Sequence, residues 1–219
     1  MTVQHLFGGL SGLLTVVCVL PYFRDVLRGV TVPQRMSWFI FAMLSTSAAV
    51  AQAAAGADSG VLLAGGAAIG FSAVFVASIK LGVGGTSRWD LVALGIGIAG
   101  LVLWHFSNRP MVAVGAIVIA ELAAVTLTVA KLLDMPGSET LSTWVIDGVA
   151  GMMAIIAVGR VDATHLLYPV HHVVLNGAVV AAIVTGHKVK QRSPLLNNDS
   201  VGSARLAVAP HATANTPVA

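Results

Sequence analysis

Long apolar runs separated by short polar loops make up most of the chain. Seven of these runs reach the roughly 20 residues that a helix needs to cross a bilayer. They are expected at residues 5–27, 35–56, 60–82, 90–108, 111–133, 140–159 and 165–187. The pattern predicts an all-α integral membrane protein with seven transmembrane helices.

The composition supports the same protein class. Hydrophobic residues make up 57% of the chain and charged residues only 10%, whereas a soluble domain carries about 25% charged residues. Such a chain cannot cover itself with a wettable surface, so we expect the lipid bilayer as a partner and a multi-pass location in the cell inner (plasma) membrane. The net charge of +3 comes mostly from loops and from the C-terminal segment. It therefore indicates topology and no nucleic-acid partner.

Lysine and arginine are concentrated at one end of the predicted spans. By the positive-inside rule this end is cytoplasmic, so the N-terminus is predicted outside and the C-terminus inside. Residues 191–219 are rich in Ser, Asn, Ala and Pro without helical periodicity, and they are predicted to form a disordered cytoplasmic tail. The basic end would carry Arg24, Arg28, Arg35, Lys80, Arg88, Lys131, Lys188, Lys190 and Arg192, and the other end Arg109 and Arg160.

An internal repeat organises the spans. Residues 141–146 open an apolar run after a polar loop in the same way as residues 35–40, with Trp144 matching Trp38. This overlay places spans one to three on spans five to seven and leaves the fourth span as a linker. Two three-helix units joined by one helix have the same orientation, so parallel repeats are expected. The predicted units are 1–89 (first repeat), 90–108 (linker helix) and 109–190 (second repeat).

Residues 5–187 resemble the SWEET and PQ-loop superfamily of small transporters, in an uncharacterised bacterial branch. The resemblance is carried by Pro21-Tyr22-Phe23-Arg24-Asp25, Pro33-Gln34-Arg35-Met36-Ser37-Trp38, Ser138-Glu139-Thr140-Leu141-Ser142-Thr143-Trp144, Leu167-Tyr168-Pro169 and Asn176. It implies a three-plus-one-plus-three helix arrangement and transport of a sugar, amino acid or vitamin by alternating access. It also implies a hinge at Pro21, although span five has Thr126-Leu127-Thr128 where a matching proline would stand.

The candidate solute-binding residues are polar side chains at mid-membrane depth. Glu121 is the only charged residue near the middle of a span, roughly 15 Å below the outer surface, where a charge costs at least about 2.5 kcal/mol. Asn176 reaches about the same depth, and the repeat overlay places Thr15 and Ser72 on the opposite wall. We expect these four residues to contact a small polar solute. The alternative for Glu121 is a protonated carboxyl that bonds between helices.

Two further functional hypotheses concern protons and gating. His172 shares a helix face with Asn176, so Glu121 and His172 could relay a proton; a polar anchor at the membrane interface is the alternative. Asp147 is expected to pair with Lys131 or Lys80 and to close an inner gate. Trp38 and Trp144 are expected in the interfacial aromatic belt.

The sequence contains no phosphate loop, nucleophile elbow, zinc-protease motif or Cys–His ligand cluster, so neither an enzyme nor a cofactor is predicted. A metal site would have to recruit His105 or Asp162, and none is predicted. The function expected is a facilitator or secondary transporter. The alternative is a non-transporting scaffold or a subunit of a larger membrane complex, and a homo-oligomer is the other expected assembly.

Overall fold

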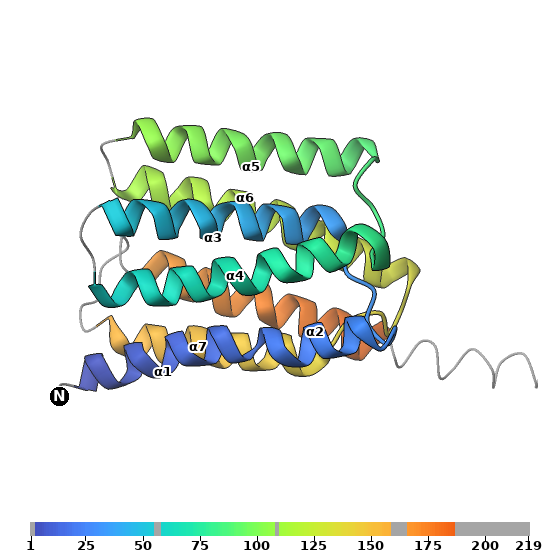
Figure 1. Ribbon diagram of the computed structural model, residues 1–219, viewed down its shortest axis with the longest axis horizontal. Helices are drawn as coiled ribbons and strands as arrows, with labels where there is room; N and C mark the ends of the chain where they lie inside the picture. Colours follow the sequence, from blue (N-terminus) through green and yellow to red (C-terminus); the bar gives the residue numbers. More distant parts are fainter. Residues whose placement is uncertain (1–2, 55–57, 108–109, 159–165, 187–219) are drawn as a thin grey trace, which may run out of the picture.

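The computed structural model describes residues 3–54, 58–107, 110–158 and 166–186, and within them the fold is all-helical. The only β-like contact among these residues is an isolated parallel bridge between Gln34 and Val83. The predicted tail, residues 191–219, lies outside the described residues. The helices in Figure 1 are α1 (Val3–Val17), α2 (Val19–Leu27), α3 (Arg35–Ala54), α4 (Asp58–Leu81), α5 (Arg88–Phe106), α6 (Pro110–Asp134), α7 (Leu141–Ala157) and an unlabelled last helix, Leu166–Gly186.

Each predicted span coincides with helical structure, and the described helix ends differ from the predicted ends by no more than two residues. Four of these stretches are long and apolar enough to cross a membrane. They are Val3–Leu27, Arg88–Phe106, Gly115–Asp134 and Leu166–Gly186, while Gly65–Leu81 and Leu141–Ala157 are shorter apolar helices. Length and apolar character therefore support the membrane-protein class.

The outer surface of the bundle is apolar. Ile69, Phe106 and Leu133, on three different helices, are 75–76% exposed. A soluble protein would have to cover large apolar side chains such as these, whereas lipid tails accommodate them. We therefore treat the outer surface as the face toward the acyl chains.

The first span is interrupted at Cys18, where α1 ends and α2 begins. Pro21 lies three residues later and has no backbone N–H to donate to the carbonyl of Val17, one turn before it. Cys18 N still donates to Leu14 O at 2.8 Å, so the two segments remain continuous. The break follows from the proline, and Pro21 lies in the first turn of α2.

Within each half of the chain the third helix lies between the first and the second. In the first half α4 packs against α3 on one side and against α1 and α2 on the other. In the second half the last helix contacts α6 through Glu121 and α7 through Asp147. Gly151 of α7 allows this approach, because a Cβ there would lie 2.8 Å from Cγ2 of Val173.

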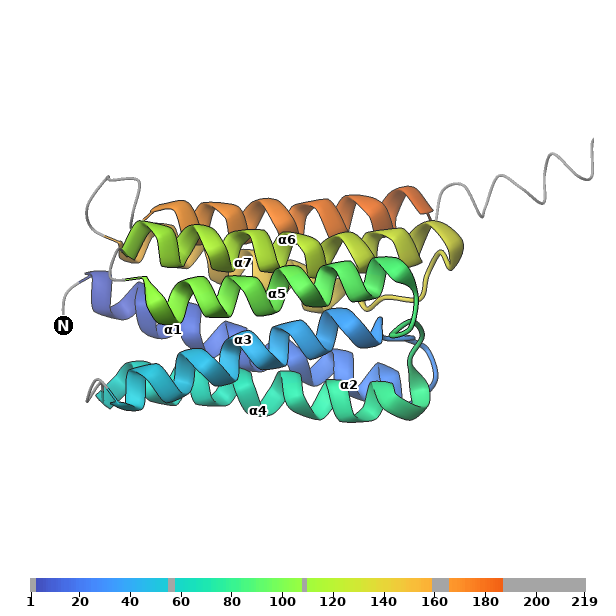
Figure 2. The ribbon, with the colours of Figure 1, turned by 90° about the horizontal axis from the view of Figure 1, so that it is seen from above.

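The two halves meet through two pairs of helices. The α1–α2 span packs on α7, and α3 packs on α6, as the views in Figures 1 and 2 show. Helix α5 lies outside this arrangement, against α6 and α3. Phe41 of α3 packs against all three clusters of buried apolar residues, so the core is continuous across the halves.

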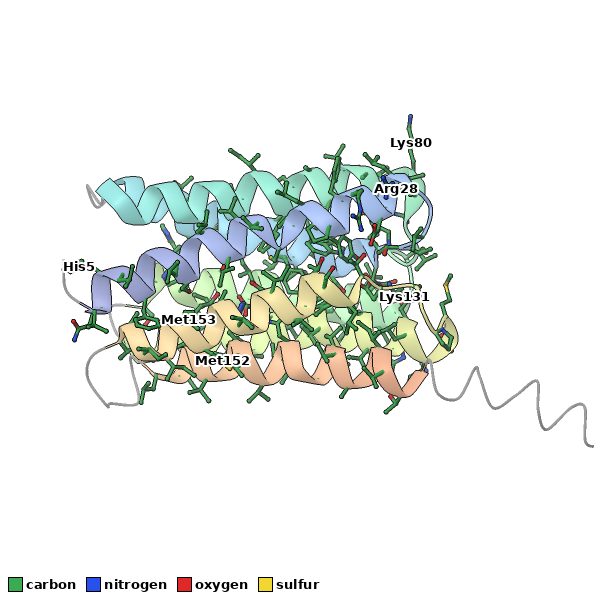
Figure 3. All side chains as sticks on the ribbon, turned by 90° about the horizontal axis from the view of Figure 1, so that it is seen from below. His5, Arg28, Lys80, Lys131, Met152 and Met153 are labelled. Carbon is green, nitrogen blue, oxygen red and sulfur yellow. The ribbon has the colours of Figure 1, made fainter. Side chains whose placement is uncertain are left out.

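The loops at the end opposite the N-terminus join the halves by hydrogen bonds. Val32 N donates to Ser138 O at 2.9 Å, and the hydroxyls of Thr31 and Thr140 are 2.6 Å apart. The same end carries the basic residues: Figure 3 shows Arg28, Lys80 and Lys131 there and His5 at the other end. Every Lys and Arg in the described part of the chain belongs to this end; they are Arg24, Arg28, Arg35, Lys80, Arg88 and Lys131.

Candidate functional site

A cavity of about 550 Å³ lies inside the bundle and is lined from both halves of the chain. Its lining residues come from α1, α3, α4, α5, α6, α7 and the last helix. They run from Trp38 and Trp144, near the loop end, to Ser11 and Ala48, nearer the end that holds the N-terminus. A mostly apolar cavity with a few convergent polar groups is typical of a small-molecule site.

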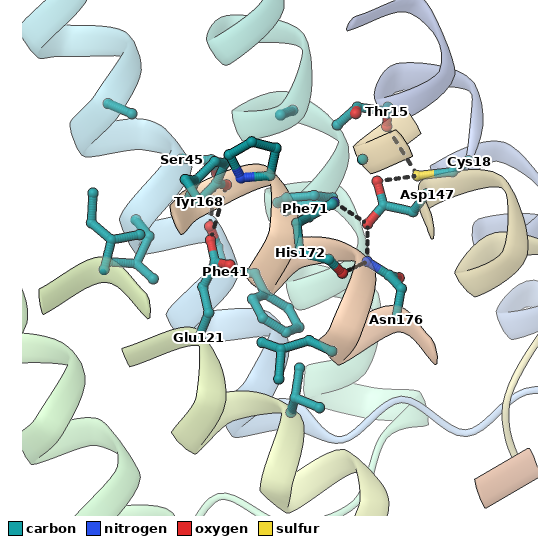
Figure 4. Close-up of a pocket in the computed structure, with 18 of the residues that line it drawn as sticks. Thr15, Cys18, Phe41, Ser45, Phe71, Glu121, Asp147, Tyr168, His172 and Asn176 are labelled. Carbon is teal, nitrogen blue, oxygen red and sulfur yellow. Dashed lines mark hydrogen bonds and ion pairs between the residues drawn. The ribbon is translucent and has the colours of Figure 1, made fainter. Parts of the chain in front are cut away.

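Glu121 is one of two carboxylates that line this cavity (Figure 4). Tyr168 donates its hydroxyl hydrogen to Oε1 of Glu121 at 3.2 Å. Nε2 of His171 lies 3.4 Å from Oε2 of Glu121 but makes no hydrogen bond there. Oε2 therefore keeps its capacity to accept a hydrogen bond from a ligand.

The tautomer of His171 determines whether its Nε2 atom can donate to Glu121. Nδ1 of His171 lies 3.1 Å from the carbonyl oxygen of Tyr168, which can only accept, so Nδ1 carries a hydrogen. In a neutral His171 the Nε2 atom is then bare and faces an acceptor oxygen of Glu121. A proton on either group, or a donor supplied by a ligand between them, would turn this contact into an attraction.

Asp147 is the second carboxylate, and its oxygens are already occupied. Nε2 of His172 lies 2.9 Å from Oδ2, Asn176 donates from Nδ2 to Oδ2 at 3.1 Å, and the thiol of Cys18 donates to Oδ1 at 3.7 Å. The cluster joins α7, the last helix and the α1–α2 junction. Asp147 therefore binds the two halves of the chain together within the cavity wall.

The predicted site residues are partly brought together. Glu121, Asn176, Thr15 and His172 all line the cavity. Ser72 does not appear among the described lining residues; its neighbour Phe71 lines the cavity from α4 instead. The predicted relay partner also changes, because His171 contacts Glu121 whereas His172 pairs with Asp147.

The expected pairing of Asp147 with Lys131 or Lys80 is corrected by the structure. Lys131 is buried and donates to a carboxylate oxygen of Glu139 and to the carbonyl oxygens of Val32 and Ser138. Lys80 is exposed at the end of α4. Asp147 lies deeper in the bundle, where its partners are His172 and Asn176.

Glu139 joins the halves at the loop end of the cavity. The sequence does not predict it as a site residue. It accepts hydrogen bonds from Tyr22 Oη at 3.1 Å and from Trp144 Nε1 at 2.9 Å, besides the pair with Lys131. Trp38 Nε1 donates in turn to Tyr22 Oη at 2.9 Å. We call Lys131, Glu139, Tyr22, Trp38 and Trp144 the inner seal.

The inner seal also corrects the placing of two tryptophans. Trp38 and Trp144 are only 3% and 6% exposed, and both indole N–H groups bond inside the bundle. They form the floor of the cavity and not part of an interfacial belt. The sequence signal was present in the repeat, since both tryptophans open their helices at matching positions.

The described residues contain no group of three or more His, Cys, Asp and Glu side chains suited to a metal ion. Asp162, which a metal site would have needed, lies outside the described residues. Comparisons of the chain with protein-family models, with curated proteins and with solved structures found no match. The function therefore has to be argued from the cavity and its side chains.

Proposed function

We propose that this chain is a secondary transporter or facilitator for a small polar solute, with two three-helix repeats joined by α5 and moving by alternating access. The observation that carries the proposal is a cavity that lies between the two halves and is closed at one end by the inner seal. A site at the junction of two repeats, closed on one side, is the geometry that alternating access requires.

The packing order supports the two-repeat arrangement. In each half the third helix lies between the first and the second. The first helix of one half also contacts the second helix of the other half, as α1–α2 with α7 and as α6 with α3. Both contacts are present. A pseudo-twofold axis along the membrane normal relates such parallel repeats, and this arrangement is the one expected of the SWEET-like fold that the sequence motifs resemble.

The distribution of basic residues supports an orientation. All described Lys and Arg residues belong to the end that carries the inner seal, so we place that end in the cytoplasm and the N-terminus outside. The cavity then extends outward from the inner seal in a protein of the inner (plasma) membrane. In this conformation the solute enters from outside.

We assign solute contact to Glu121, Asn176 and Thr15, and gating to Lys131 within the inner seal. Proton coupling at Glu121 is part of the proposal, with His171 as the direct partner. The titratable groups that face Glu121 are Tyr168 and His171, and the next charges are those of His172 and Asp147. A proton that enters or leaves the Glu121–His171 pair changes the charge of the cavity wall.

A scaffold role is the second candidate, and one observation favours it. The hydroxyl of Tyr168 donates to Glu121, and a carboxyl with a purely structural role would need such a neighbouring donor. The same carboxyl nevertheless lines the cavity, and only one of its two oxygens accepts a hydrogen bond from a described residue. A carboxyl with a packing role alone would be expected to have both oxygens satisfied within the protein.

Uptake of labelled solutes into proteoliposomes tests transport. We expect one solute class among sugars, amino acids, vitamins and amines to equilibrate faster than in protein-free liposomes. Glu121→Gln should lower this flux by about tenfold or more, because it removes a charge-assisted contact. Ser45→Ala is the matched control, since the Ser45 hydroxyl lines the same cavity but already bonds to carbonyls of its own helix. Absence of flux for every class would contradict transport.

A further inference from the structure

Glu121 supplies an acceptor oxygen in the cavity. Its Oε1 accepts from Tyr168, whereas Oε2 has no donor among the described residues and faces Nε2 of His171 at 3.4 Å. Glu121 lines the cavity. A carboxylate oxygen in this position is suited to a ligand that donates hydrogen bonds.

Several donors near the cavity are already used. Asn176 Nδ2 bonds to Asp147 and to the carbonyl of His172, and Tyr168 Oη bonds to Glu121. The indole N–H groups of Trp38 and Trp144 belong to the inner seal. These donors are therefore not available to a ligand.

The two carboxylates that line the cavity differ in their partners, because Asp147 is paired with His172 whereas Glu121 accepts only from Tyr168. Glu121 and Asp147 line the cavity, and no Lys or Arg is among the described residues that line it. A carboxylate on a ligand would find no guanidinium or ammonium group as a partner. This arrangement disfavours anions and zwitterionic amino acids and favours a cation.

Aromatic rings cover much of the remaining wall. An ammonium group is attracted to the face of such a ring, and an apolar ligand body packs against it. The rings that line the cavity are those of Trp38, Phe41, Phe71, Trp104, Trp144 and Tyr168. The cavity volume of about 550 Å³ accommodates an organic cation of several carbon atoms.

We propose that the cavity binds a small organic amine as its ammonium ion, with N–H groups donated to Glu121 Oε2 and an apolar body held by the aromatic wall. This inference names the solute class and rests on the proposed function, because it takes the cavity as the solute site. A primary amine is charged at neutral pH, as lysine is, so the binding form is the abundant one.

Calorimetric titration of the full chain in lipid nanodiscs tests the proposal, with the heats of empty nanodiscs subtracted. The probes are phenethylamine and butylamine, their neutral counterparts 2-phenylethanol and 1-butanol, and phenylalanine and glucose. We expect each amine to bind at least about tenfold more tightly than its alcohol, because only the amine forms charge-assisted bonds with Glu121. This comparison needs no variant.

Two variants then locate the contact. Glu121→Gln should weaken both amines about tenfold and leave the alcohols unchanged, while its amide oxygen still accepts from Tyr168. Thr126→Ala, at an exposed α6 position outside the cavity lining, should change neither. Alcohols that bind as tightly as amines, preferred binding of phenylalanine or glucose, absence of amine binding, or amine binding that Glu121→Gln leaves unaltered would each overturn the proposal.

The same probes separate this inference from the proposed transport. Amines that bind but do not cross proteoliposomes would refute transport and leave the amine site standing. A different solute that crosses, with a flux sensitive to Glu121→Gln, would refute the amine site and leave transport standing.

Discussion

Two ion pairs of a Lys or Arg with a carboxylate, both in the described part of the chain, differ in burial, and this difference determines how much each contributes to stability. The side chains of Lys131 and Glu139 are 4% and 0% exposed, whereas that of Arg24, which pairs with Asp25, is 57% exposed. Water and salt screen an exposed pair, so it contributes little. A buried pair depends on both partners, because the loss of one leaves an uncompensated charge.

We therefore expect Lys131→Met to destabilise the protein by about 3–5 kcal/mol, because Glu139 would stay buried without its cation. Arg24→Ala, the matched control at the same end, should cost about 1 kcal/mol or less. Reversible unfolding in mixed micelles measures both. Similar losses in the two variants would show that the Lys131 charge is not buried in the folded protein.

Depth along a helix could be predicted from the sequence, but the direction of a side chain could not. Glu121 and Asn176 were assigned to one level by counting 1.5 Å per residue, and both line the cavity. The repeat overlay placed Ser72 at the same depth, yet its neighbour Phe71 lines the cavity. Neighbouring residues point about 100° apart on a helix, and only the packing of the other helices determines which of them faces inward.

At the scale of elements, the apolar runs predicted the helices well because bilayer thickness sets their length. The pairing of side chains from different elements was not predictable in the same way. Glu139 lies in the loop before α7 but bonds to Tyr22 of α2, 117 residues away in the chain. Only Pro21 indicated the interruption at Cys18. The resemblance to the transporter superfamily implied a hinge at this proline.

Replacement of Pro21 by alanine tests the hinge. Alanine restores an N–H that can donate to Val17 O, so we expect a continuous helix and a gain in stability of up to about 3 kcal/mol. If the α1–α2 span bends during the cycle, flux through Pro21→Ala falls while amine binding is unchanged. Leu20→Ala, at an exposed neighbouring position, should keep normal flux. Unaltered flux in Pro21→Ala would argue against a hinge there.

At the scale of the whole molecule, the cavity and the inner seal lie along one path between the halves. The seal joins α2 of the first half to the start of α7 in the second through Tyr22, Glu139 and Trp144. A rigid-body movement of one half against the other would have to break these bonds. Our proposal assigns this conformation to the outward-facing state.

Sided labelling of a cysteine in the cavity tests that state. Because Cys18 is the only cysteine in the chain, Cys18→Ala with Ser45→Cys places a single thiol in the cavity wall. We expect an impermeant thiol reagent to label it from the side of the N-terminus and only weakly from the side of the loops.

Lys131→Met and Glu139→Gln weaken the inner seal, so each should raise labelling from the loop side. The expected rise is about tenfold for every 1.4 kcal/mol by which the variant favours the open form. Two variants with different side-chain volumes separate this effect from a packing defect. Equal labelling from both sides before the seal is weakened would mean that the seal does not close the path, and alternating access would lose its structural basis.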